Sequence, residues 1–286
     1  MAARAVAPAQ DPQRTYWVLM LVPLFVLGAL YVYPLGKVLW MSVTVPEPGL
    51  GNYAALIDNA ALRRILGVTF RICLITTVFA VGLGYLVAYV MLHVRPLHQL
   101  LILFCVLLSF WMSVLIRAFA WIALLQPRGL VNSTLLGLGV IDQPLALVRN
   151  ELGVIIGMVH YMLPYAILPL LANMQGLNPA LVPAARGLGA SPRAAFLRVF
   201  LPLTAPGIFA ASVLVFIFSL GFFVTPAILG GGRTVMVAEY ISLQVVETLN
   251  WGLGTMIASS LLVSVLLMVV VAARFVDMRR MFGAGT

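Results

Sequence analysis

The chain has 286 residues, of which 63% are hydrophobic and only 9% charged, and its mean hydropathy is +1.10. Soluble domains carry about 25% charged residues, so this composition excludes a soluble globular protein. The net charge of +9 does not indicate nucleic-acid binding, because the basic residues are spread between apolar runs without forming a basic stripe. Cys73 and Cys105 both lie inside apolar runs, which excludes a disulfide framework and a thiolate metal site.

Six apolar runs approach or exceed the length of about 20 residues that a membrane-spanning helix requires. They cover residues 16–35, 66–92, 97–116, 152–171, 205–229 and 254–275. The segments between them contain the Pro, Gly, Asp and Asn residues typical of loops. The first run is too long for a signal-peptide core, so we expect it to stay attached as the first helix. The sequence predicts one all-α integral membrane domain over residues 1–286, with six transmembrane helices.

The distribution of basic residues predicts the orientation of these helices, because cytoplasmic loops of membrane proteins are enriched in Lys and Arg. With six crossings, both termini lie on one side. The termini and the loops on that side hold nine arginines: Arg4, Arg14, Arg95, Arg186, Arg193, Arg198, Arg274, Arg279 and Arg280. The opposite loops hold six basic residues and also six acidic ones. We therefore predict a multi-pass membrane protein with both termini in the cytoplasm.

The apolar runs contain small residues at a helical repeat but few ionisable groups. Ala80, Gly84 and Ala88 recur every four residues, which predicts a face for close helix packing. No acidic residue lies deep in a run, although secondary transporters usually mark their ion path with such groups. Arg71 and Arg117 lie near the predicted outer ends of helices, where long side chains commonly reach the membrane interface. The energy for any solute transport is therefore expected to come from another protein.

The loop over residues 178–202 carries the strongest signal. It opens with an Asn-Pro pair that is typical of a helix start, reaches Gly189 as a helix stop, and restarts with a Ser-Pro pair. We expect two short helices, the second ending at Pro202. Three arginines surround the Ala-rich tip: Arg186, Arg193 and Arg198. Such a hairpin has little apolar surface of its own, which indicates that it docks into a groove of a partner protein.

This loop resembles the cytoplasmic coupling loop of the membrane permeases of ATP-binding-cassette importers. The family pattern reads E-A-A, three residues, G, nine residues and I-x-L-P. Ala184, Ala185 and Gly189 match it, and residues 199–202 supply the hydrophobic-x-Leu-Pro ending. Pro183 stands where the family has Glu, so the family's acidic contact with its ATPase is missing, and we expect the proline to disturb the first short helix.

The resemblance implies an importer permease of the bacterial inner membrane that is not itself an enzyme. It implies four kinds of partner in the assembly: a second related permease, two cytoplasmic ATPase subunits, a periplasmic substrate-binding protein and membrane lipid. ATP and Mg²⁺ are expected on the ATPase, and no cofactor or metal on this chain. The only lysine, Lys37, lacks the glycine spacing of a phosphate-binding loop. The residues implied in coupling to the ATPase are Pro183, Ala184, Ala185, Arg186, Gly189, Ser191 and Arg193.

Further stretches resemble the spermidine/putrescine branch of these permeases. They are residues 117–121, 129–132, 162–169, 219–231 and 250–251. Polyamine members often carry a carboxylate near position 222, where this chain has Phe222, so the resemblance indicates the branch rather than one ligand. Putrescine or spermidine is the first substrate expectation, and an ω-amino acid, an opine or a similar small solute is the alternative. An ion-coupled secondary carrier and a membrane scaffold without transport activity also remain open.

A cationic solute would need acidic groups at the outer mouth and aromatic faces along its path, because the helices contain no deep acids. Glu239 and Glu247 are the outer acids, eight residues apart, and would share a face if the segment is helical. Trp111 and Phe222 would supply cation–π contacts of about 0.5–2 kcal/mol each. With Arg117, these four residues are the predicted substrate path; isolated loop charges and lipid-facing aromatic residues are the alternative explanation.

Overall fold

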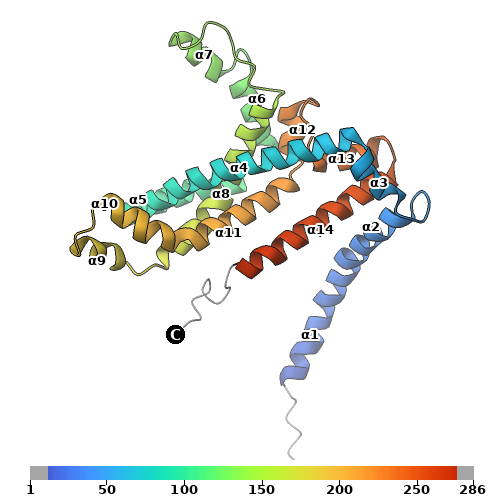
Figure 1. Cartoon of the computed structure of the whole chain (residues 1–286), viewed down its shortest axis with the longest axis horizontal. Coiled ribbons are helices and arrows are strands. Elements are labelled where there is room, and N and C mark those ends of the chain that lie inside the picture. Colours follow the sequence, from blue (N-terminus) through green and yellow to red (C-terminus); the bar gives the residue numbers. More distant parts are fainter. Residues whose placement is uncertain (1–11, 276–286) are drawn as a thin grey trace, which may run out of the picture.

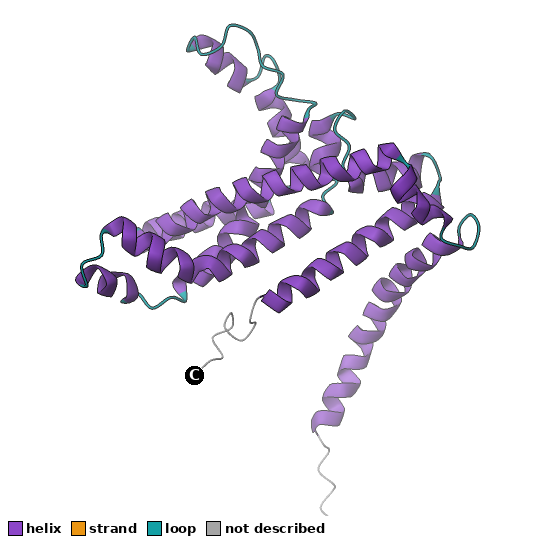
Figure 2. Cartoon of the chain, in the orientation of Figure 1, coloured by secondary structure: helices purple, strands orange, loops and turns teal. Residues whose placement is uncertain are grey.

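The computed structural model describes residues 12–275 (Figure 1). Within that range the chain forms helices joined by loops, without a strand (Figure 2). Six helical segments are long and apolar enough to cross a membrane: Leu19–Thr44, Ala60–His93, Val114–Gly137, Glu151–Gln175, Pro192–Leu220 and Trp251–Arg274. The predicted all-α fold with six membrane-spanning helices is therefore confirmed.

The first half of the chain contains seven α-helices, and two breaks in it were not predicted. These helices are α1 (Pro12–Leu27), α2 (Tyr33–Thr44), α3 (Gly51–Asp58), α4 (Ala60–His93), α5 (Pro96–Trp111), α6 (Val114–Leu125) and α7 (Leu130–Gly137). A π-helical turn, Gly28–Val32, joins α1 to α2, so the first predicted helix extends past residue 35. The predicted helix 97–116 is wrong, because Met112 and Ser113 adopt extended backbone conformations between α5 and α6. Hydropathy cannot detect this break, since the apolar run continues through it.

The second half contains the remaining helices. They are α8 (Glu151–Gln175), α9 (Leu181–Gly187), α10 (Pro192–Ala195), α11 (Leu201–Leu220), α12 (Val224–Gly230), α13 (Val237–Ser242) and α14 (Trp251–Phe275). The predicted helix 205–229 is also wrong, because α11 ends at Leu220 and α12 is a separate short helix. Segments predicted as loops contain α3, α7 and α13. Each of these helices is eight residues or shorter, too short to show a clear apolar period.

The chain does not leave the helix at Pro202, as the sequence had suggested. A second π-helical turn, Phe196–Phe200, joins α10 to α11, and the Leu201 N–H bonds to the Phe196 carbonyl five residues earlier. This wider turn leaves one carbonyl without a helical partner, and a proline fits there because it has no N–H to donate. The fifth span therefore begins at Pro192 and runs directly out of the coupling loop.

The core lies where α4, α8 and α11 pack side by side (Figure 1). Ala80, Gly84 and Ala88 are all buried on α4, which confirms the predicted packing face. A Cβ atom on Gly84 would lie 2.9 Å from the Ala166 Cβ of α8. This approach allows dispersion contact between backbones, the main attraction available to helices inside a membrane. The small residues thus fix α4 against α8, and these two helices position the site at their ends.

The helix pair α1–α2 leaves the bundle and is held mainly through α2, which packs against α14 (Figure 1). Large apolar side chains such as Phe25 and Tyr31 on this pair are 77% and 74% exposed. Exposure of this kind suits lipid or another transmembrane chain, because neither penalises apolar surface.

Candidate functional site: the coupling hairpin and the aromatic cluster

Local side-chain and backbone signals shape the coupling hairpin, residues 178–202. The Asn178 Oδ1 accepts a hydrogen bond of 2.9 Å from the Ala180 N–H, and α9 then begins at Leu181. Gly189 follows α9 with a φ of 92°, a left-handed conformation that favours glycine. The Ser191 Oγ accepts from the Ala194 N–H at 3.2 Å and caps α10. The predicted helix–stop–helix pattern is confirmed, but the predicted start at the Asn-Pro pair is wrong, because α9 begins at Leu181 and its N-cap, Ala180, has no side-chain cap.

The disturbance expected from Pro183 is absent, because α9 continues from Leu181 to Gly187. Pro183 is the third residue of this helix, and N–H groups in the first turn have no partner within a helix. The first helical hydrogen bond is made by the next residue, Ala184, whose N–H bonds the Ala180 carbonyl at 2.9 Å. Pro183 therefore removes no helical hydrogen bond.

The hairpin presents most of its predicted coupling residues at the surface. Exposed side chains or backbone are found at Pro183, Ala184, Arg186, Gly189, Ser191 and Arg193, whereas Ala185 is half-buried. Leu188, at the tip of the hairpin, is 91% exposed although it is fully apolar. An apolar side chain in this position gains free energy only when another surface covers it. The tip is therefore shaped for contact with another molecule.

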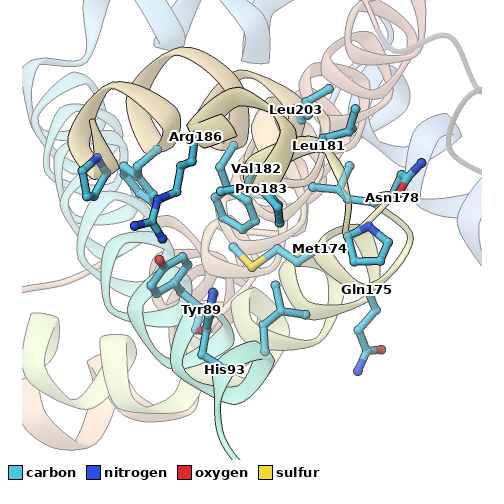
Figure 3. Close-up of a pocket in the computed structure, with 16 residues that line it drawn as sticks. Tyr89, His93, Met174, Gln175, Asn178, Leu181, Val182, Pro183, Arg186 and Leu203 are labelled. Carbon is cyan, nitrogen blue, oxygen red and sulfur yellow. The ribbon is translucent and has the colours of Figure 1, made fainter. Parts of the chain in front are cut away.

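A cavity of 580 Å³ separates the hairpin from the ends of α4, α8 and α11 (Figure 3). Tyr89 and His93 of α4 and Met174 of α8 form its inner wall, and Pro183 and Arg186 of α9 form its outer wall. The Arg186 side chain extends toward Tyr89 at one edge of the cavity (Figure 3). Tyr89 is held by edge-on contacts with Phe196 and Phe200 at 5.5 and 5.4 Å. These contacts anchor the hairpin through the π-helical turn Phe196–Phe200, and Val182 of α9 also packs against the core.

A second cluster surrounds Arg117, near the start of α6. This side chain is only 5% exposed, so it does not extend to the membrane interface as the sequence had suggested. Its Nη2 donates to the carbonyls of Ser109 and Met112, the latter at 3.2 Å. These carbonyls lie at the end of α5, where the helix break leaves them without helical partners. Arg117 therefore caps α5 and stabilises the α5–α6 break.

Aromatic side chains of α8 complete this cluster. The Arg117 guanidinium lies 4.8 Å from the centre of the Tyr161 ring, a cation–π contact. Phe222 packs against the same ring at 4.4 Å, and Tyr165 stacks on it at 6.0 Å. Sequence reasoning found Arg117 and Phe222 but missed the two tyrosines. Their spacing of four residues, which places them on one helix face, was the available signal.

The Trp121 Nε1–H donates to the His160 Nδ1 at 3.1 Å and ties α6 to α8 beside the cluster. His160 is half-buried, and this hydrogen bond pairs its Nδ1. Trp111 lies outside the cluster and is 85% exposed at the end of α5. The structure therefore groups Phe222 with Arg117, but it does not group Trp111 with them.

The two outer acids occupy different environments. Glu239 is buried in α13 and its Oε2 has no hydrogen-bond partner, whereas Glu247 is exposed. Burial raises the pKa of Glu239, and a hydrogen bond from the Met236 backbone opposes that shift. A π-helical turn, Leu243–Glu247, follows α13, and because one acid is buried and the other exposed, the two carboxylates do not form the joint outer site that the sequence predicted. Among residues 12–275 no His, Cys, Asp or Glu group suits a metal ion.

The sequence that forms this bundle and its exposed hairpin matches a known protein family. Residues 80–281 match the family described as binding-protein-dependent transport system inner membrane component. This chain belongs to that family. It is the permease subunit of an ATP-binding-cassette importer, a transport subunit of the inner membrane.

Most of the sequence of this permease aligns with named members of the family. The spermidine/putrescine transport system permease protein PotB of Haemophilus influenzae is 34% identical over 223 residues, which is 78% of each chain. PotB of Escherichia coli K12 is 33% identical over 222 residues, 78% of this chain and 80% of that protein. A bacterial alginate ABC transporter, solved in complex with an alginate-bound periplasmic protein, superimposes with a TM-score of 0.75 at 19% identity, covering 93% of this chain and 96% of that chain. This last likeness concerns the fold.

Proposed function

We propose that this permease imports a small amino compound such as putrescine or spermidine, and that ATP hydrolysis on a separate ATPase subunit drives the transport. The identity of about one third to the PotB permeases supports the substrate class. The observation that carries the coupling role is the exposed hairpin, whose tip presents Leu188 and Gly189 away from the bundle. ATP and Mg²⁺ belong to the ATPase, while the hairpin transmits its movement directly into α11, since the fifth span begins within it.

The proposed orientation places the hairpin and both termini in the cytoplasm. Segments 126–150 and 230–252 then face a periplasmic binding protein. The excess of arginine on the hairpin side supports this orientation. A second, homologous permease and two ATPase subunits complete the proposed assembly.

The Arg117 cluster favours a second candidate substrate, a small solute that carries a carboxylate, such as an ω-amino acid or an opine. Arg117 has no acidic partner among residues 12–275, and its Nε is buried without a hydrogen bond. Phe222, which packs against the same Tyr161 ring, supplies no negative charge for a polyamine. A solute with both an amine and a carboxylate would fit this environment better than a polyamine, because a polyamine adds like charge.

The coupling role is tested in the complete transporter, reconstituted in lipid discs with its ATPase and binding protein. Gly189→Val forces a β-branched residue into a left-handed backbone conformation, and Ala184→Asp adds a charge to the exposed face. Both should abolish the stimulation of ATPase activity by loaded binding protein. Gly82→Val is the matched control, because a Cβ at this exposed α4 position meets no atom within 4 Å.

Normal stimulation in both hairpin variants would contradict the docking role. Substrate class is measured separately with labelled putrescine, spermidine and γ-aminobutyrate. Uptake of γ-aminobutyrate but of neither polyamine would replace the first candidate by the second.

A further inference from the structure

The hairpin carries one sign of charge only. Residues 176–202 contain three arginines and no aspartate or glutamate. Pro183 stands where the E-A-A pattern has its glutamate. Gly187, directly before the tip residue Leu188, has no side chain that could carry a charge. At the position where the pattern places an acid the hairpin is therefore neutral, and its three charged side chains are all positive. A surface that receives this hairpin meets cations and no anion.

The arginine charges are not neutralised within the described part of the chain. The single ion pair found in residues 12–275 joins Arg71 to Glu151, away from the hairpin. Arg186 and Arg193 are both exposed, and the cavity beside Arg186 is lined by Tyr89 and His93 but by no aspartate or glutamate. Both guanidinium groups thus keep their five donors for a partner.

The shape of the tip indicates how a partner would seat. Leu188 is 91% exposed between α9 and Gly189, so it projects as an apolar knob. A groove runs beside it along Pro183, Arg186 and Pro192. Covering this apolar side chain in a pocket would be favourable, and arginines beside it can fix the orientation of a partner through charge-assisted hydrogen bonds.

We infer that the ATPase surface that receives this permease is acidic, with carboxylates opposite Arg186 and Arg193 around an apolar socket for Leu188. This inference rests on the proposed docking of the hairpin and adds the chemistry of its partner surface. A second copy of this hairpin is a poor occupant, because two such surfaces would bring like charges together. The ATPase of this transporter would thus face a hairpin that carries three arginines and lacks the glutamate of the pattern.

The deciding experiment restores the glutamate. Pro183→Glu and Pro183→Gln differ by one charge and lie in the first turn of α9, where a glutamate favours the helix. A loss of function in Pro183→Glu relative to Pro183→Gln therefore reports repulsion rather than unfolding. In the complete transporter in neutral phosphatidylcholine discs, we expect binding-protein-stimulated ATPase activity to be about fivefold lower for Glu than for Gln. The difference should shrink at high salt.

Arg186→Glu should show the same deficit relative to Arg186→Gln. Arg95→Glu is the control. This exposed arginine lies between α4 and α5, near the end of α4 that lines the hairpin cavity, but outside the hairpin. If Pro183→Glu equals or exceeds Pro183→Gln, the ATPase surface is not acidic and the inference fails. If the deficit appears only when anionic lipid is added, the arginines face the membrane, and the inference fails as well.

These outcomes are separate from a failure of the coupling role itself. Loss of stimulation in Gly189→Val together with a normal Pro183→Glu protein would support the docking role and refute the acidic ATPase surface. Normal stimulation in every hairpin variant would refute both the docking role and the acidic ATPase surface.

Discussion

Substitution of Gly84 by alanine tests the contact that holds α4 against α8. The new Cβ would lie 2.9 Å from the Ala166 Cβ, at least 0.5 Å inside the 3.4 Å at which ordinary contact begins. Neither atom can rotate away, because both are fixed to helix backbones, so the helices must separate. Overpacking of this kind costs about 1–3 kcal/mol. We therefore expect Gly84→Ala to lower the free energy of unfolding by that amount.

The assay is reversible unfolding of the purified permease in mixed micelles, followed by tryptophan fluorescence. Gly82→Ala is the control, because its Cβ meets nothing within 4 Å, and it should be neutral or slightly stabilising. In the double variant Gly84→Ala/Ala166→Gly the clashing methyl is removed, and the closest remaining neighbour is the Ile167 N at 3.4 Å. The double variant should recover at least 1 kcal/mol relative to the sum of the single variants. Additive effects, or a Gly84→Ala protein as stable as Gly82→Ala, would refute the close approach.

Three further predictions concern other parts of the chain. With both native cysteines replaced, a cysteine at Ser191 should resist an impermeant thiol reagent in intact cells while one at Ser133 reacts; the reverse labelling would invert the proposed orientation. Glu239→Gln should raise the melting temperature more at pH 8 than at pH 5, because burial raises the pKa of Glu239 and penalises its charged form above that pKa, whereas the exposed Glu247→Gln protein should show no such difference. Arg117→Met leaves the carbonyls at the end of α5 without this donor, and should lower the free energy of unfolding by about 1–3 kcal/mol; an unchanged value would argue against the cap.

The sequence determined the features that arise from neighbouring residues. The hairpin follows from the turn that Asn178 forms with Ala180, the side-chain cap at Ser191 and the left-handed Gly189, each acting within a few residues. The packing face of α4 follows from the small residues that recur at Gly84 and Ala88, because membrane helices associate where their backbones approach closely. Composition and run length predicted six membrane helices, since the bilayer sets their length.

Only the tertiary structure decided where the long apolar runs break and which polar groups become buried. The break before α6 lies in uninterrupted apolar sequence, and it is stabilised by Arg117, which reaches the end of α5 and the Tyr161 ring of α8. Likewise Glu239 is buried and Glu247 exposed, although both are acids of one predicted loop. Such outcomes depend on contacts between residues far apart in the chain, and a local pattern of hydrophobicity contains no information about those partners.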